Sequence, residues 1–334
     1  MSGKILQGDI LMRNLIIPSG SPLRKIFPLV RKLRHWAFKF HDRAGIRLVI
    51  SGGPVRFMDA ELNFAEKVGL LYSTPLFWNG PDAYEMPTSE TLALLLKHSR
   101  LFLDIGSNIG IYSVYAGVKC PQVKTFSFEP IPSIWEKNRA FHRANGLPDQ
   151  NVHQLALGDR VGPQEIIIPV YATGLEEEQT ATLYADSWQS HEKQVERIQI
   201  QCTTLDTFAA TNPLPDGPCC VKIDVENFEA AVLRGGRKFI TARRPWIVCE
   251  ILPTQKIDPV TGIRVNDNAQ VIALVQELHY TPFAITADGF FRMTPADFER
   301  PRGLKDFLLA PAEKIPAEVS YFERTSLAQL LPAP

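Results

Sequence analysis

The chain has 334 residues, which is enough for one or two domains and a sizeable hydrophobic core. Hydrophobic residues make up 45% of it and charged residues 22%, a composition typical of ordinary globular proteins. Lys and Arg together number 36, as do Asp and Glu, so the net charge is zero and we expect no bulk nucleic-acid binding, which draws on a basic surface.

Residues 1–85 are rich in turn formers, and we assign them to an N-terminal extension with helical potential. Ser51-Gly-Gly-Pro54 predicts a turn within it. Residues 24–36 combine Arg, Lys and His with interleaved apolar residues, a pattern that suits a membrane surface or an acidic partner. We favour the simpler interpretation, a solvated helix face packed on the domain.

Residues 86–315 carry the signals of an α/β domain, followed by a tail over residues 316–334. Strands and helices alternate over residues 101–158, which favours a parallel sheet. Residues 173–196 are polar and show no clear period, and we interpret them as a flap on the substrate side. The other predicted elements are helices at Thr88–Leu96 and Asp267–Leu278 and strands at Gln164–Tyr171, Gln199–Thr203, Pro245–Glu250 and Phe307–Ala310. In addition, Cys219–Glu229 predicts a buried strand that runs into a helix ending at Gly235-Gly236.

The most informative stretch is an apolar run that ends in Asp104 and is followed by a turn containing Gly106 and Gly110. A second apolar run ends in Glu129, so the pattern predicts strand, tight loop, helix and strand. Gly106 allows a sharp turn off the strand, and Gly110 allows the next helix to pack closely on the sheet. Open α/β sheets bind ligands outside the carboxyl ends of their strands. The two acids there favour a ligand with hydroxyls and a cationic centre over a phosphate.

Two other glycine loops fit this stretch poorly. A P-loop needs Lys after its last glycine, and none follows Gly110. A dinucleotide loop needs Gly-x-Gly-x-x-Gly, and position 108 is Asn. The remaining pattern, Asp-x-Gly-x-x-x-Gly with an acid after the next strand, resembles motif I of the S-adenosylmethionine-dependent methyltransferases.

The chain as a whole resembles the FkbM family of methyltransferases over roughly residues 85–255. The resemblance implies a doubly wound, mostly parallel, seven-stranded sheet of the class I methyltransferase, Rossmann-like type. The family usually has Gly where this chain has Asn227, and Asn tolerates a positive φ better than most residues. The residues that carry the resemblance are Asp104–Gly110, Phe128-Glu-Pro130, Ala156-Leu157, Thr204-Leu-Asp206, Lys222–Glu226 and Glu250.

The resemblance implies S-adenosylmethionine as the cofactor. Glu129 would accept the ribose hydroxyls, and Asp104 would hold the methionine amino group or order the glycine loop. Gly106 and Gly110 would shape the backbone, and Asn108 would lie near the carboxypropyl group. The segment with Leu157 and Asp159 would end the third strand of the main sheet, near the adenine; an exposed turn acid is an interpretation of Asp159 that is at least as strong.

The implied reaction is methyl transfer, and we expect the oxygen of a small-molecule or glycan hydroxyl as acceptor. A hydroxyl must lose its proton, which favours a nearby general base. The candidates are Asp224, Glu226, Glu250 and His191, without a choice among them. The acids alternatively form structural pairs with Lys222, and we expect no metal.

Other functions stay open at this point. A nicotinamide-dependent oxidoreductase also uses an acid at the position of Glu129, but it would need the missing dinucleotide loop. A noncatalytic binding module on the same fold would not need the intact set of acids and glycines. Methylation of RNA would want a basic cleft with stacking aromatic residues.

The five cysteines fit neither a zinc pattern nor a disulfide framework, which suits a reducing compartment. The N-terminus lacks a secretory signal, and no apolar run approaches the roughly 18 residues of a membrane span. We therefore expect a cytoplasmic protein, and the sequence predicts no oligomeric state.

Overall fold

The computed structural model describes residues 13–22, 24, 46–66, 68–169, 195–251, 256–257, 264–265, 267–294, 297–298 and 304–315. The chain divides into two compact units, Met1–Tyr84 and Glu85–Pro334. Most of the predicted flap and basic segment and all of the predicted tail lie outside the described residues. Their roles, like the predicted domain boundaries, stay predictions.

The first unit contains two small sheets and a helix. Strands β1 (Arg13–Pro18) and β2 (Ile46–Ser51) pair in parallel, and β3 (Gly53–Phe57) and β4 (Ala60–Phe64) form a hairpin. Helix α3 (Leu70–Asn79) follows. The sequence did not predict the hairpin, although its alternation buries Val55, Phe57, Leu62 and Phe64.

The turn predicted at residues 51–54 is confirmed, since Gly52 and Gly53 both have positive φ angles. Arg24 is the one described residue of the basic segment, and it is buried. Its guanidinium donates to the carbonyls of Ser51, Gly52 and Pro54 in this turn. Arg24 therefore has a structural role in this turn, and the interpretation of the rest of the basic segment stays a prediction.

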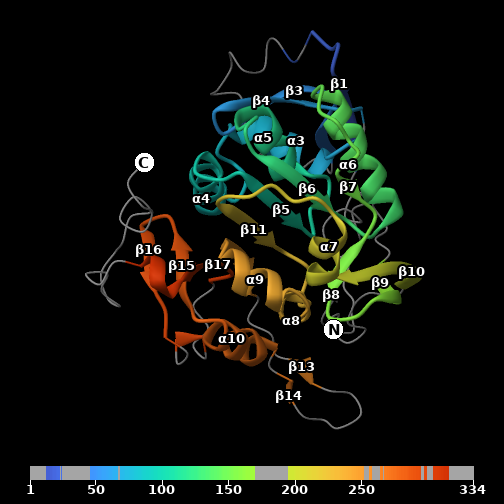
Figure 1. The fold of residues 1–334 in the computed structure, drawn as a ribbon. Helices are drawn as coiled ribbons and strands as arrows, with labels where there is room; N and C mark the ends of the chain where they lie inside the picture. The colour runs from blue at the N-terminus through green and yellow to red at the C-terminus, as the bar shows by residue number, and fades with distance from the viewer. Residues whose placement is uncertain are drawn as a thin grey trace, which may run out of the picture. The chain divides into compact units, whose positions relative to one another are not determined.

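The second unit is built on an eight-stranded sheet (Figure 1). Five parallel strands, β7, β6, β5, β11 and β12, are followed by β17, β15 and β16, which pair in antiparallel fashion. One strand more than expected is present, because β16 closes a hairpin with β15. In sheet order the strands are β16 (Gly289–Arg292), β15 (Tyr280–Thr286), β17 (Asp306–Pro311), β12 (Trp246–Glu250), β11 (Cys219–Ile223), β5 (Leu101–Ile105), β6 (Lys124–Phe128) and β7 (Val152–His153).

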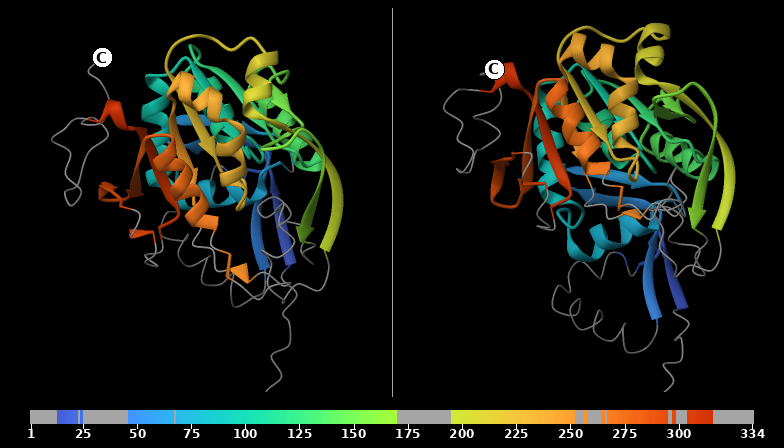
Figure 2. Two further views of the ribbon diagram at one scale, coloured as in Figure 1. Left: turned by 60° about the horizontal axis from the view of Figure 1, so that its bottom comes forward. Right: turned by 90° about the horizontal axis from the view of Figure 1, so that it is seen from below.

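Helices cover both faces of this sheet, so the doubly wound α/β fold is confirmed (Figure 2). The chain alternates between strand and helix, and the two sets of crossovers lie on opposite faces. One face carries α4 (Met86–Lys97), α5 (Ile111–Lys119) and α6 (Pro132–Ala144). The other carries α7 (Leu205–Thr211), α8 (Glu229–Gly235), α9 (Arg237–Arg243) and α10 (Asp267–Glu277).

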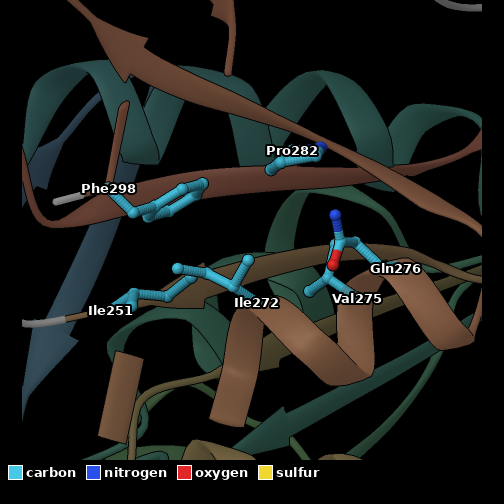
Figure 3. Close-up of a pocket in the computed structure, with 6 residues that line it drawn as sticks. All are labelled: Ile251, Ile272, Val275, Gln276, Pro282 and Phe298. Carbon is cyan, nitrogen blue, oxygen red and sulfur yellow. The ribbon is translucent and has the colours of Figure 1, made fainter. Parts of the chain in front are cut away.

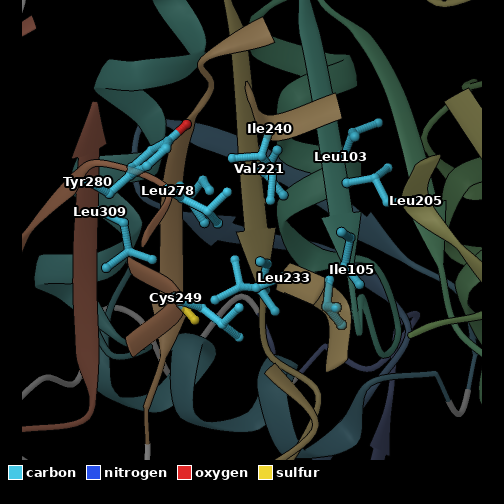
Figure 4. Packing of buried hydrophobic residues seen from close by; sticks show 14 of the residues in the cluster. Leu103, Ile105, Leu205, Val221, Leu233, Ile240, Cys249, Leu278, Tyr280 and Leu309 are labelled. Atoms are coloured by element: carbon cyan, nitrogen blue, oxygen red, sulfur yellow. The ribbon is translucent and has the colours of Figure 1, made fainter. Parts of the chain in front are cut away.

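One large core cluster lies between the sheet and the second set of helices (Figure 4). Leu103 and Ile105 of β5 and Val221 of β11 point into it, against Leu233 of α8 and Ile240 of α9. Strands buried on both faces are apolar on both, as expected for parallel strands in an α/β protein. Residues that alternate with these along the strands, such as Phe102, point to the opposite face of the sheet and are also fully buried.

A second sheet lies beside the first and changes one expectation. Ala156–Gly158 forms β8, but it pairs with β10 (Val195–Thr204), which also pairs with β9 (Gly162–Pro169). The strand beside β6 in the main sheet is instead the short β7. The remaining described elements are β13 (Lys256–Ile257), β14 (Arg264–Val265) and the single-turn η4 (Ala312–Lys314).

Truncating a side chain of the central strand tests this packing. Phe102 is 0% exposed, so we expect Phe102→Ala to lower the free energy of unfolding by about 3–5 kcal/mol, through lost burial and a cavity. The control is Val161→Ala, because Val161 is 67% exposed and should change stability by no more than about 0.5 kcal/mol. Urea unfolding followed by circular dichroism measures both. Equal effects of the two substitutions would contradict the assigned core.

Candidate functional site

The candidate site lies between β5 and β11, where the order in which the chain adds strands to the sheet changes direction. The chain runs from β5 outward to β6 and β7, and from β11 outward to β12 on the other side. The backbone N–H of Asp224, just after β11, donates to the carbonyl of Ile105 at the end of β5 (3.0 Å). Asp104 and Asp224 therefore meet at the switch point, where open α/β sheets bind ligands.

The glycine loop, residues Gly106–Gly110, has an unusual backbone. Gly106, Asn108 and Gly110 have φ angles of 74°, 50° and 83°, in the left-handed region that favours glycine. A Cβ on Gly106 would collide with the carbonyl of Asp224, which confirms that this glycine is needed for the turn. A Cβ on Gly110 would collide with the side chain of Asn138, so the close neighbour of Gly110 is helix α6 and not the sheet.

Asp104 is buried below this loop, with 1% of its surface exposed. Its Oδ2 accepts from the backbone N–H of Ser113 in α5 (3.1 Å), so the carboxylate orders the start of that helix. Its Oδ1 is buried without a hydrogen-bond partner among the residues that the structure describes. Burial raises the pKa of Asp104 to about 6, although Lys222 and Ser113 act to lower it. One oxygen thus remains as an acceptor for a ligand.

Glu129 closes the other side of the loop. Its Oε2 accepts from the N–H of Asn108 (3.1 Å), and its Oε1 accepts from the N–H of Ile131 (2.9 Å). Each oxygen retains a lone pair, because a carboxylate oxygen can accept two hydrogen bonds. Burial raises the pKa of Glu129 to about 7, against the two backbone hydrogen bonds.

Three acids form what we call the carboxylate cluster: Asp224, Glu226 and Glu250, with oxygen atoms all within 4.8 Å of one another. Two lysines neutralise part of its charge. Lys222 donates to Asp224 (2.7 Å), and Lys305 donates to Glu250 (3.0 Å). Hence the structure brings together three of the four predicted base candidates; the fourth, His191, lies outside the described residues.

The three carboxyls of the cluster differ in acidity. Although burial acts to raise it, the charge and hydrogen bond of Lys222 hold the pKa of Asp224 below its ordinary range. Burial and the negative charge of Asp224 raise the pKa of Glu226 to about 8 and that of Glu250 to about 9. At neutral pH the cluster therefore combines an ionised aspartate with two largely protonated glutamates.

The lysines connect the cluster to the helices on one face of the sheet. Lys305 also binds Glu85 (3.2 Å), which accepts from the Tyr112 hydroxyl of α5 (2.9 Å). Lys222 lies over the ring of the same tyrosine, 5.2 Å from its centre. Carboxylate oxygens at these distances also suit a divalent cation. Lysines already bind two of the three acids, which competes with a metal ion for the same oxygens. The expectation of no metal stays a prediction.

The structure places the remaining predicted residues away from the cluster. Leu157 is a core residue with 2% exposure. Asp159, just after β8, accepts from Arg234 Nε of α8 (2.9 Å) in an ion pair. The proposed adenine contacts of these two residues stay predictions.

The loop after Asp224 contains two successive residues with left-handed backbone conformations. Glu226 and Asn227 have φ angles of 50° and 75°, so Asn227 does tolerate a positive φ where the family usually has Gly. Glu229 fixes this loop, since its Oε1 accepts from the N–H groups of Val225 (3.3 Å) and Asn227 (3.1 Å). Glu229 had no sequence signal of its own.

A hollow lies between α10 and β15, on the face of the sheet that carries α7–α10 (Figure 3). It holds about 280 Å³ of space that includes open solvent. It has no carboxylate, amine or thiol in its lining, so we do not include it in the candidate site. The lining residues are Ile251, Ile272, Val275, Gln276, Pro282 and Phe298.

The fold and these residues define an α/β protein with several carboxylates gathered at the switch point of its main sheet. Comparison with known families gives the particular family. The family described as "Methyltransferase FkbM domain" matches residues 104–282, more than half of the chain. The chain therefore belongs to the FkbM methyltransferase domain family, and the resemblance seen in the sequence is confirmed.

Individual relatives are more distant. "Methyltransferase 1" of Beauveria bassiana (strain ARSEF 2860) is 28% identical over 149 residues, which are 40% of this chain and 57% of that protein. The chain thus matches little more than half the length of this relative. A solved FkbM methyltransferase of Methylobacillus flagellatus KT is 14% identical, with a TM-score of 0.36 over 64% of this chain and 44% of that one. Precorrin-6y C5,15-methyltransferase of Geobacter metallireducens GS-15 is 12% identical, with a TM-score of 0.32 over 67% and 86% of the two chains.

Among the described residues, none of the helices has the length and apolar character needed to cross a membrane.

Glu229 gives a pH-dependent test of the loop after Asp224. Burial raises its pKa from an ordinary 4.5 to about 7. An acid with a raised pKa stabilises the fold below its unfolded value, and this contribution is lost as the pH rises through about 7. Glu229→Gln keeps the accepting Oε1 and cannot ionise, so its stability relative to wild type should increase between about pH 5 and about pH 8.

Urea unfolding at both pH values measures this difference. Glu136→Gln, on an exposed side chain of α6, controls for the change in net charge. A Glu229→Gln difference that is independent of pH would contradict the buried, protonatable site assigned to Glu229.

Proposed function

We propose that this chain is an S-adenosylmethionine-dependent methyltransferase that methylates a hydroxyl oxygen of a small molecule or glycan. The observation that carries the proposal is the pair of buried acids, Asp104 and Glu129, on either side of a glycine loop at the switch point. Both retain acceptor capacity. Membership of a methyltransferase family supports the same reaction class.

The residues present fit this donor. Oδ1 of Asp104 is a buried acceptor without a partner among the described residues, and it suits the ammonium group of the methionine part. Glu129 presents two oxygens to the ribose hydroxyls, the role that strand-end acids take in nucleotide sites. When bound, the donor supplies an electrophilic methyl group on a sulfonium. Asp104 and Asp224 are both ionised at neutral pH, and their negative charge at this edge is compatible with that positive charge.

Within the carboxylate cluster we assign the general base to Glu226. A base works best when its pKa lies near the operating pH, and the pKa of about 8 is the closest of the three. Asp224 is ionised but weakened as a base by Lys222, and Glu250 is bound by Lys305. Glu226 would accept the hydroxyl proton, while the two lysines fix its neighbours.

The donor is tested by calorimetric titration of the protein with S-adenosylhomocysteine, with NAD in parallel. We expect binding of S-adenosylhomocysteine alone. Glu129→Ala should weaken it by at least about tenfold, because removal of a charged acceptor leaves ribose donors unpaired. Glu165→Ala, on an exposed side chain of β9, is the control and should leave the affinity unchanged.

The outcomes separate the functions that the sequence left open. Binding of NAD alone would favour the oxidoreductase, and binding of neither ligand would favour the noncatalytic module. Binding that Glu129→Ala does not weaken would remove the ribose role from Glu129.

The general base is tested with an acceptor found by screening neutral hydroxyl compounds and glycans for transfer of labelled methyl. We expect the wild-type rate to rise with pH through about 8, as Glu226 loses its proton. Glu226→Gln should remove this rise and lower the rate by about 10²–10⁴-fold. Glu277→Gln, an exposed acid of α10, is the control. An unchanged pH profile in Glu226→Gln would assign the base elsewhere.

A further inference from the structure

The polar contacts behind the glycine loop converge on one side chain, Asn138 of α6. It is 0% exposed, and it lies 30 residues from the loop residue whose carbonyl it binds. Its Nδ2 donates to the carbonyl of Asn108 (2.8 Å) and lies 3.0 Å from the hydroxyl oxygens of both Ser107 and Ser127. One amide group thus reaches two residues of the loop and one of strand β6.

The contact with Asn108 has a specific consequence for the loop. Asn108 holds a left-handed conformation, which is less favourable for a residue with a Cβ than for glycine, although Asn tolerates it better than most. Its carbonyl is held by Asn138, and its N–H is held by the Glu129 carboxylate. The two contacts together fix both sides of this residue, so the position of Glu129 relative to the loop depends on Asn138.

The amide oxygen of Asn138 packs closely against the backbone of Gly110. It faces Gly110, at a spacing that no Cβ would tolerate, and it has no hydrogen-bond partner among the described residues. A buried amide oxygen without a partner is costly. The side chain therefore sits where its donor side serves the loop, at the expense of its acceptor side.

We propose that Asn138 is a positioning residue for the methyl donor, acting through the glycine loop and Glu129. This inference rests on the proposed function. Asn138 does not touch the donor in this scheme; it holds Asn108 so that the N–H of that residue orients the ribose-binding carboxylate. Loss of its Nδ2 should allow Asn108 to leave the left-handed region and release Glu129.

The test is the affinity of the full chain for S-adenosylhomocysteine, measured by calorimetry well below the unfolding temperature of each variant. Asn138→Leu is similar in size and lacks the donor, and we expect it to weaken binding by at least about tenfold. Tyr280→Phe is the matched control, because it removes another buried hydrogen bond, to the carbonyl of Pro245 (2.9 Å), at the other end of the sheet. It should lower the unfolding temperature and leave the affinity within about twofold of wild type.

A second variant separates positioning from general loss of stability. Asn138→Asp keeps the size, and its carboxyl can donate one hydrogen only when protonated. The ratio of its affinity to that of wild type, both measured at the same pH, should therefore be closer to one at about pH 5.5 than at about pH 8. This variant also serves if Asn138→Leu fails to fold.

The outcomes are distinct. Wild-type affinity in both Asn138 variants, or an equal loss in Tyr280→Phe, would overturn the positioning role while leaving the proposed function intact. Absence of wild-type binding to S-adenosylhomocysteine would overturn the proposed function, and this inference with it.

Discussion

The arrangement of this site depends on one buried cation, Lys222. It is 5% exposed and lies level with Asp104 on the neighbouring strand, while its ammonium binds Asp224. Buried charges are costly unless they are paired, and the carboxyl edge of a parallel sheet collects acids from several strands. Although burial acts to lower it, the nearby carboxylates raise the pKa of Lys222, so the lysine stays charged and allows Asp104 to be buried beside the half-buried Asp224.

The same constraint gives the three acids of the carboxylate cluster different pKa values. Two lysines face more acids than they can neutralise, so the acids that lie further from Lys222 retain protons. Glu226 and Glu250 are therefore neutral for much of the time, and Asp224 carries the charge. A set of chemically similar side chains thereby acquires different proton affinities from position alone, a property that acid–base chemistry near neutral pH requires.

The sequence predicts the elements whose signals are local. The apolar runs that end in Asp104 and Glu129, and the glycines between them, report strand ends and a tight turn within a few residues. Residues such as Lys305 and Asn138 give no such signal, because their roles depend on contacts 55 residues away with Glu250 and 30 residues away with Asn108. The pairing of Ala156–Gly158 with β10 instead of β6 was missed for the same reason, since partner choice between strands is a tertiary property.

Helix α5 connects the two halves of the site. The N–H of its Ser113 donates to Asp104, beside the glycine loop, so this carboxylate fixes the start of the helix. Its Tyr112 hydroxyl reaches Glu85, and Glu85 shares Lys305 with Glu250 of the carboxylate cluster. Adjacent residues of one helical turn are therefore tied to both sides. This turn of helix therefore links the position of the loop to that of the cluster. The methyl transfer that we propose would benefit from this link, because the rate of an in-line transfer depends on the alignment of the reacting atoms.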